Sequence, residues 1–241
     1  MKIRIKFRKY GVMKFIGHLD IMRYFQKAIR RADIDISYSG GFSPHMIMSF
    51  AAPLGVGITS DGEYVDIEVN STKSTKESLK ALNDTMVEGV EVSGYVLLPD
   101  NAKTAMSIVA AADYELSFKE GYEAPADMAA FENAIETYFT NAKDVLITKQ
   151  TKKSERTMDL KPLVYDFHMI TKEDKPAFYL NLSTGSTDNV KPELVVEALF
   201  ERMGLAYHPN AIQIHRIDVY AVKNDAANTF ISLGDMGTVI L

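Results

Sequence analysis

Two histidines stand in the most unusual local sequences of this 241-residue chain. His18 lies in Gly-His-Leu-Asp, and His45 ends a turn-rich stretch that begins at Tyr38. An imidazole beside a 2′-hydroxyl can act as general acid or base, and a tyrosine hydroxyl could assist it. These three side chains are therefore candidates for metal-independent RNA cleavage. The alternative for His18 is structural, because it falls at an expected helix start, where it could cap the first turn.

The stretch that ends at His45 also has the composition of a binding loop. Its adjacent glycines, Gly40 and Gly41, allow a positive φ angle or a close approach of the backbone to a ligand. The remaining residues of the loop that we take as binding candidates are Ser39, Phe42, Ser43 and Pro44. A wide structural turn would explain the same residues, and the sequence leaves both interpretations open.

Basic residues gather in the first 32 positions, which hold ten Lys/Arg against the single acid Asp20. Lys and Arg neutralise phosphates and supply most sequence-independent affinity for nucleic acid. The candidate nucleic-acid contacts on the first strand and the helix after it are Lys2, Arg4, Lys6, Arg8, Arg23, Lys27, Arg30 and Arg31. The alternative is an ordinary cross-strand charge ladder with Asp66 and Glu68 on a neighbouring strand.

Composition and motif content exclude several kinds of site. The chain has no cysteine, so it holds no disulfide, no thiolate zinc site and no cysteine-ligated iron–sulfur cluster. Its histidines show no metal-binding spacing, and nucleotide-binding and hydrolase motifs are lacking, so we expect no metal, no cofactor and a binding role before an enzymatic one. The N-terminus alternates charged and apolar residues, which predicts a cytoplasmic protein without membrane contact.

Hydrophobic periodicity predicts the elements that would position these residues. Residues 2–8 alternate like a half-buried strand, and residues 19–32 repeat apolar positions at three and four like an amphipathic helix. Further elements are expected at 46–51 (strand), 64–69 (strand), 75–86 (helix) and 90–98 (strand). The simplest closure of this βαββαβ order is a four-stranded antiparallel sheet with its helices on one face, the ferredoxin-like arrangement.

The second half repeats this order of elements, with one additional or split strand. Its expected elements lie at 114–118 (strand), 126–141 (helix), 144–149, 163–170 and 176–182 (strands), 192–204 (helix) and 212–222 (strand). We therefore predict an α+β protein of two tandem ferredoxin-like units, 1–100 and 111–223, with a loosely attached tail over 224–241. The duplication rests on element order alone, because no residue-level repeat links the halves.

Longer motifs resemble a known family. The segments are Gly17-His-Leu-Asp20, Tyr38-Ser-Gly-Gly-Phe-Ser-Pro-His45, Ser49-Phe-Ala-Ala-Pro-Leu-Gly-Val-Gly57 and Glu63-Tyr-Val-Asp66. They are similar to the radical-SAM-associated domain family of unknown function, found fused behind or encoded beside B12-binding-type radical S-adenosylmethionine proteins. The resemblance covers essentially the whole chain and is most specific over residues 15–66.

This resemblance implies a partner more than a reaction. The radical S-adenosylmethionine protein would hold its cluster through its own cysteines, which fits a companion chain that has none. The resemblance adds two motif positions, Asp20 and Glu63, to the binding candidates named above.

Three functions compete. The chain could be an RNA-binding or substrate-presenting accessory to the radical enzyme, a structural partner without nucleic-acid contact, or a metal-independent endoribonuclease. Salt-sensitive RNA binding would favour the first function, since phosphate contacts weaken as salt rises.

Overall fold

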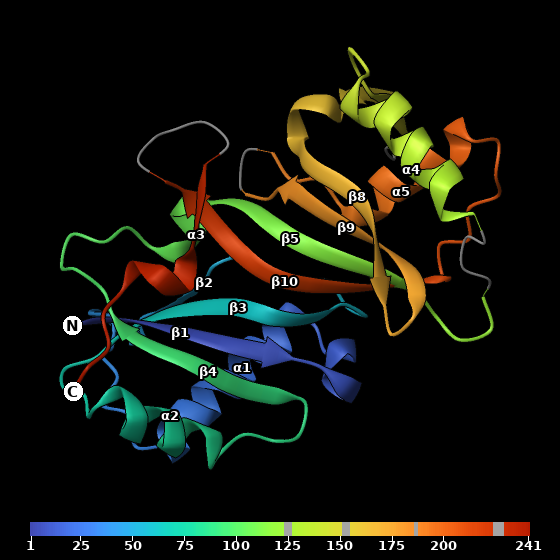
Figure 1. The fold of residues 1–241 in the computed structure, drawn as a ribbon. Coiled ribbons are helices and arrows are strands. Elements are labelled where there is room, and N and C mark those ends of the chain that lie inside the picture. The colour runs from blue at the N-terminus through green and yellow to red at the C-terminus, as the bar shows by residue number, and fades with distance from the viewer. Residues whose placement is uncertain (123–126, 151–154, 186–187, 224–228) are drawn as a thin grey trace. The chain divides into compact units, whose positions relative to one another are not determined.

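The computed structural model describes residues 1–122, 127–150, 155–185, 188–223 and 229–241. The chain forms two compact units, and the first is built from both ends of the chain (Figure 1). Unit 1 comprises Met1–Ala110 and Arg216–Leu241, and unit 2 comprises Ala111–His215. This division differs from the boundaries expected from the sequence, because the residues after 215 belong with the first unit.

Unit 1 is an antiparallel sheet with helices on one face. Its elements are β1 (Lys2–Lys9), η1 (Gly11–Phe15), α1 (His18–Arg31), β2 (Met48–Phe50), β3 (Thr59–Glu68), α2 (Thr75–Asn83), β4 (Val90–Leu97), α3 (Ala105–Ile108), β11 (Phe230–Ser232) and η4 (Leu233–Met236). Strand β1 lies between β3 and β4, and β2 and β10 (Ile212–Val222) are further neighbours of β3. Figure 1 shows α1 and α2 along the β1–β4 side of this sheet.

Local sequence explains why these helices begin where they do. Helix α2 opens with a capping box, in which the Ser74 hydroxyl accepts from the Glu77 amide and the Glu77 carboxylate accepts from the Ser74 amide. Helix α1 starts after Gly17, carries Asp20 in its first turn and ends in two arginines, which suits the helix dipole.

The core of unit 1 lies between the sheet and its helices. The alternate residues of β1 that face this core are Ile3, Ile5 and Phe7, all buried. They pack with apolar residues of α1, α2, β3 and β4 in one cluster, which includes Phe25, Ile29, Val65, Ile67, Leu82 and Tyr95. The expected strand is therefore present with the apolar face that its alternation predicted, although Arg4 on its other face is buried as well.

The opposite side of this sheet is covered as well, by the C-terminal segment. Strand β11 pairs with β10, Leu233 is fully buried, and Thr238 pairs with Leu97 on β4. Short backbone pairings and one buried leucine therefore hold residues 229–241 on the sheet, which differs from the loosely attached tail expected over 224–241. Residues 224–228 lie outside the described part of the chain.

Unit 2 has a different arrangement of strands. Its elements are β5 (Val109–Phe118), α4 (Met128–Ile135), η2 (Glu136–Thr140), β6 (Leu146–Gln150), β7 (Glu155–Asp159), η3 (Lys161–Leu163), β8 (Val164–Lys172), β9 (Lys175–Ser183), α5 (Pro192–Arg202) and the first residues of β10. Strand β9 pairs antiparallel with both β5 and β8, whereas β6 and β7 pair with each other in a separate two-stranded sheet.

The coarse prediction of a mixed α+β protein with mostly antiparallel sheets is confirmed. The finer prediction of two tandem ferredoxin-like units is not confirmed, because β6 and β7 leave the main sheet and the last strands return to unit 1. In the described ranges, no helix is long and apolar enough to cross a membrane.

Candidate functional site

The cations of β1 have partners inside unit 1. Arg4 is 1% exposed and forms a two-pronged pair with Asp66, with Nε–Oδ1 and Nη2–Oδ2 distances of 2.8 and 3.0 Å. The Arg4 Nη1 group also donates to the Leu233 carbonyl of the C-terminal segment, at 3.2 Å. A guanidinium enclosed in this way is not available to a phosphate. Arg4 therefore attaches the C-terminal segment to the sheet through a hydrogen bond.

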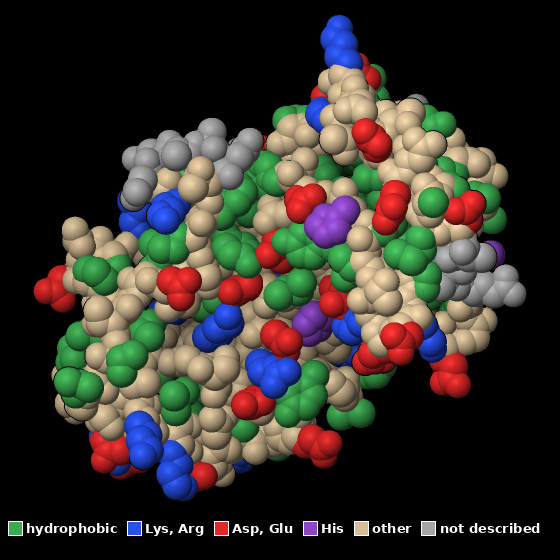
Figure 2. Space-filling model, viewed as in Figure 1, with side chains coloured by type: hydrophobic (Ala, Val, Ile, Leu, Met, Phe, Trp, Pro, Cys, Tyr) green, Lys and Arg blue, Asp and Glu red, His purple; other side chains and the backbone are tan. Residues whose placement is uncertain are grey.

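The other basic residues of β1 are likewise engaged. Lys6 Nζ lies 3.0 Å from Asp218 Oδ2, and Arg8 Nε lies 2.7 Å from Asp61 Oδ1. Lys2 Nζ donates to the carbonyls of Asp100 and Ala102. The cations of β1 therefore pair with neighbouring groups of the protein, as the charge-ladder alternative expected. Among them, only Arg4 pairs with an acid named from the sequence, Asp66. Figure 2 shows Lys/Arg and Asp/Glu side chains interspersed on its visible face of unit 1.

Asp218 is the centre of a polar cluster. Its carboxylate accepts from the Tyr64 hydroxyl at 2.5 Å and the Ser232 hydroxyl at 2.8 Å, and it pairs with Lys6. Burial, reinforced by the negative charge of Asp218, raises the pKa of Tyr64. The tyrosine is therefore a neutral donor that joins β3, β10 and β11. A cavity of about 180 Å³ opens beside it, lined among others by Lys6, Ser93 and Asp235.

A second buried cluster contains the motif residue Glu63. Arg216 donates to both of its carboxylate oxygens, at 2.8 and 2.6 Å, and also to the carbonyl of Ala52 at 3.0 Å. Lys9, which is 2% exposed, donates to the Ile16 carbonyl at 2.9 Å. Burial lowers the pKa of Lys9, with Glu63 opposing and Arg216 adding to that shift. Arg216 thus links Glu63 to the segment after β2, and Glu63 is no open ligand group.

The predicted catalytic histidines have separate surroundings. His18 is the first residue of α1, and its ring meets Phe50 edge-on at 5.3 Å between centroids. Phe50 belongs to an aromatic group with Phe7 and Phe25. His45 instead lies close to Ser39, with Nδ1 and Oγ 2.8 Å apart. Across the described residues, no hydrogen bond or ring contact joins the two histidines.

The predicted binding loop is an exposed excursion between α1 and β2. Tyr38 and Met46 form an isolated β-bridge at its base, and Gly41 has a φ angle of 97°. Phe42 at the tip is fully exposed, and Tyr38 is 48% exposed. Gly40, Ser43 and Pro44 are also exposed, and Ser39 is half-buried. The positive φ angle makes glycine necessary at position 41 for the turn itself.

The basic residues of α1 differ from those of β1. Arg23, Lys27, Arg30 and Arg31 are all exposed on this 14-residue helix. Within the described part of the chain, the one ion pair among them joins Arg23 to Asp20, at a loose 3.7 Å with both side chains largely in solvent. The predicted nucleic-acid set therefore separates into an occupied group on β1 and an accessible row on α1.

Sequence reasoning missed Lys9, Tyr64, Arg216 and Asp218 as members of these clusters. The contacts that join Arg216 to Glu63 and Asp218 to Tyr64 and Lys6 link residues 153 to 212 positions apart along the chain. No local pattern encodes such a pairing. The one available signal was the alternation of Arg216 and Asp218 with apolar neighbours in the last long strand.

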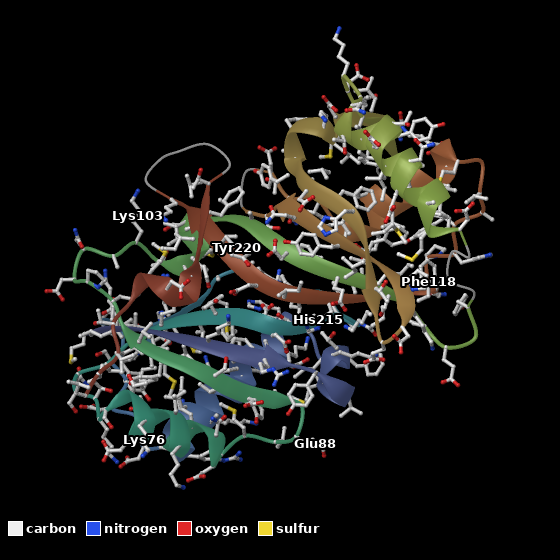
Figure 3. The ribbon with its side chains drawn as sticks, viewed as in Figure 1. Lys76, Glu88, Lys103, Phe118, His215 and Tyr220 are labelled. Carbon is white, nitrogen blue, oxygen red and sulfur yellow. The ribbon has the colours of Figure 1, made fainter. Side chains whose placement is uncertain are left out.

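Unit 2 contains an aromatic pocket that the sequence did not indicate. The cavity, of about 290 Å³, lies where β5 and α5 end, and its lining includes Phe118, Tyr122, Phe200, Tyr207 and His208. Figure 3 labels Phe118 at the end of β5. Burial, together with the charges of Glu193 and Glu197, raises the pKa of Tyr207 to about 12. Among the described residues, no group of three or more His, Asp or Glu is placed to hold a metal ion.

Comparison with known proteins identifies one family and several distant structural likenesses, of which two are described. No curated protein matches the chain. A chain in a crystal structure of a Cbf5-Nop10-Gar1 complex is 10% identical, with a TM-score of 0.49, and the match covers 90% of this chain and 48% of that one. This protein thus spans about half the length of that chain.

The second likeness is to the crystal structure of an unknown protein from Galdieria sulphuraria, at 10% identity and a TM-score of 0.22, covering 89% of this chain and 96% of that one. Residues 2–192 match the family model described as an uncharacterised protein conserved in bacteria, DUF2344. Because this match spans well over half of the 241-residue chain, the protein belongs to the DUF2344 family of conserved bacterial proteins.

Proposed function

We propose that this protein is an RNA-binding accessory to a radical S-adenosylmethionine enzyme, and that it contacts RNA through the outer face of α1. The observation that carries the RNA part is the row of exposed cations on this helix: Arg23, Lys27, Arg30 and Arg31. The radical enzyme as partner rests on the resemblance of the Gly17–Asp20 and Tyr38–His45 motifs.

The distribution of charge supports unit 1 as the RNA-facing part. Unit 1 has 16 Lys/Arg and 15 Asp/Glu, whereas unit 2 has 11 Lys/Arg and 17 Asp/Glu. A phosphate backbone is repelled by a strongly acidic surface and attracted by clustered cations. The ion pairs of β1 neutralise that strand, so α1 supplies the accessible positive charge.

The geometry of α1 suits a phosphate backbone. Side chains three and four residues apart lie on the same face of a helix, so Arg23, Lys27 and Arg30 or Arg31 follow one another along it. From Arg23 to Arg31 the helix rises about 12 Å, which spans roughly two phosphates of an extended strand. The contacts would be independent of base sequence, because they address the backbone alone.

The test is RNA binding by the full chain, measured by fluorescence anisotropy with a labelled single-stranded RNA over a salt series. We expect the Lys27→Glu/Arg30→Glu/Arg31→Glu variant to lose affinity by about tenfold or more and to flatten the slope of log K against log salt by about 2. The matched control, Lys73→Glu/Lys76→Glu/Lys103→Glu, reverses the charge of three exposed lysines elsewhere on unit 1 and should leave the affinity within about threefold. Figure 3 labels Lys76 and Lys103.

Equal losses in the two variants would show a general charge effect and remove α1 from the proposal. Absence of RNA binding by the unaltered chain at low salt would remove the RNA function itself. The partner is tested separately, by co-purification of the tagged chain with the radical S-adenosylmethionine protein after nuclease treatment.

A second candidate function is that of a structural protein partner without nucleic-acid contact. The observation that favours it is a group of exposed apolar side chains around η1 in unit 1.

A further inference from the structure

Four large apolar side chains are exposed around η1 in unit 1. Val12 is 77% exposed and Phe15 is 64% exposed on η1 itself, while Leu19 on α1 and Val56 in the loop after β2 are 61% and 63% exposed. Single apolar residues at a surface are common and need no explanation. A contiguous group of them is rarer and typically marks a protein-binding surface. We call these four residues the η1 surface.

Backbone contacts make the η1 surface contiguous. The Gly57 amide donates to the Lys14 carbonyl at 2.8 Å, which places Val56 beside the residues of η1. Leu19 follows Phe15 by four residues, at the start of α1. Because helical side chains lean toward the N-terminus of their helix, Leu19 points back toward η1.

The η1 surface is held rigidly although its side chains lie in solvent. The Tyr10 amide donates to the Gly89 carbonyl at 2.9 Å, and the buried Lys9 ammonium holds the Ile16 carbonyl at the other end of η1. Gly89 approaches so closely that a Cβ there would lie 2.6 Å from Met13 Cγ. Met13 therefore points inward and fixes the turn, and Val12 and Phe15 are presented outward. A preorganised apolar surface loses little entropy when a partner binds.

Cations border the η1 surface. Lys14 Nζ lies 5.3 Å from the centroid of the Phe15 ring, and Arg23 is one turn beyond Leu19 on the same face of α1. Lys27 continues that face, and the nearest acid on it is Asp20, which is loosely paired with Arg23. An apolar centre with a positive border complements a ligand that has the reverse pattern, an apolar stripe flanked by carboxylates.

We propose that the η1 surface binds an acidic amphipathic helix of a partner protein, with Phe15 and Leu19 as its central anchors. An amphipathic helix presents apolar residues at i, i+3, i+4 and i+7, a stripe that matches a compact apolar group of this kind. The assignment of this helix to the radical S-adenosylmethionine protein rests on the proposed accessory function. The η1 surface and its apolar and charged character are independent of that function.

The experiment uses the full chain and three labelled peptides of about 18 residues, roughly 27 Å when helical. The first has a Leu/Phe stripe flanked by Glu, the second has the same composition permuted so that no apolar face forms, and the third has Lys in place of Glu. Binding is measured by fluorescence anisotropy. We expect the first peptide to bind at least about tenfold more tightly than the other two.

The variant Phe15→Ser/Leu19→Ser should weaken binding of the first peptide by about tenfold or more, the loss typical of central anchors. The matched control, Met106→Ser/Val239→Ser, removes two apolar side chains that are 57% and 66% exposed elsewhere on unit 1, and it should bind like the unaltered chain. Thermal unfolding of both variants verifies that each is folded.

Three results would overturn the proposal. One is equal binding of the striped and permuted peptides, and another is unchanged binding by Phe15→Ser/Leu19→Ser. The third is concentration-dependent self-association of the chain that this variant abolishes, which would assign the η1 surface to a second copy. The α1 charge variant tests RNA binding independently, so failure of the peptide experiment and failure of the proposed RNA function are distinguishable.

Discussion

Identical residue types on one strand have opposite environments in this protein. Arg4 and Arg8 both alternate with apolar residues on β1, yet the Arg4 side chain is 1% exposed and the Arg8 side chain is 42% exposed. A buried charge depends on its partner, because water cannot replace that partner. An exposed pair gains little, since solvent screens it.

Alanine substitutions at these two arginines should therefore differ sharply in effect. Arg4→Ala leaves Asp66 buried without its guanidinium, and we expect the free energy of unfolding to fall by about 3–5 kcal/mol. Arg8→Ala, whose partners Asp61 and Glu91 remain in water, should cost under about 1 kcal/mol. Urea denaturation measures both, and similar losses for the two variants would contradict the burial of Arg4.

Lys9 should give the protein a measurable pH dependence. Because its folded-state pKa lies below the ordinary value of 10.5, the folded chain binds fewer protons at Lys9 than the unfolded chain between those two values. The free energy of unfolding must then rise with pH through this interval. We expect the difference between the unaltered chain and Lys9→Met to grow in favour of the unaltered chain as pH approaches 10.5. A difference that stays constant in urea denaturation across this range would disprove the shift.

At the scale of elements, the sequence predicted those parts whose periodicity is local. The expected strand at 2–8 and helix at 19–32 correspond to β1 and α1, because their apolar repeats face a core that those repeats define. The structure adds α3, β7 and β11, which are too short or too polar to show a period. The pairing of β11 with β10 is a tertiary contact that the local sequence of the C-terminal segment does not predict.

The site was harder to predict than the elements for a related reason. The alternation of β1 identified which residues share a face, and the expected charge ladder with Asp66 and Glu68 agrees with Arg4 opposite Asp66 and Lys2 opposite Glu68 in the register of β1 and β3. It could not show that Leu233 and its neighbours cover that face. The exposure of the α1 cations follows from local amphipathicity, so their position on the outer face of the helix could be predicted from the sequence.

The C-terminal segment offers a direct test of this covering. Leu233 is fully buried, and Leu233→Ala should lower the free energy of unfolding by about 2–5 kcal/mol, as is usual for a buried leucine. Val239 in the same segment is 66% exposed, and Val239→Ala should change stability by under about 0.5 kcal/mol. Equal and small effects in chemical denaturation would mean that the segment is loosely attached after all.

At the scale of the molecule, unit 1 is discontinuous in sequence. Residues 1–110 supply the sheet and helices, and residues 216–241 supply Arg216, Asp218 and Leu233. A unit of this construction needs both segments, since either alone leaves buried charges without partners.

Fragments should reveal this dependence. We expect residues 1–110 alone to lack a cooperative unfolding transition, because Glu63 loses Arg216 and Lys6 loses Asp218. A chain in which a Gly/Ser linker of about ten residues joins Ala110 to Arg216, in place of unit 2, should restore that transition. Circular dichroism during thermal unfolding distinguishes the two, and a fully cooperative 1–110 fragment would refute the prediction.

The same discontinuity determines the order in which the two units can fold during synthesis. Ribosomes add roughly 5–20 residues per second, so the 105 residues of unit 2 separate the two halves of unit 1 by about 5–20 s of synthesis. During that delay Arg4 can already pair with Asp66, because both have been synthesised. Lys6 and Glu63 cannot form their ion pairs, because Asp218 and Arg216 have not yet been translated. Unit 2 is thus synthesised, and free to fold, before unit 1 can close.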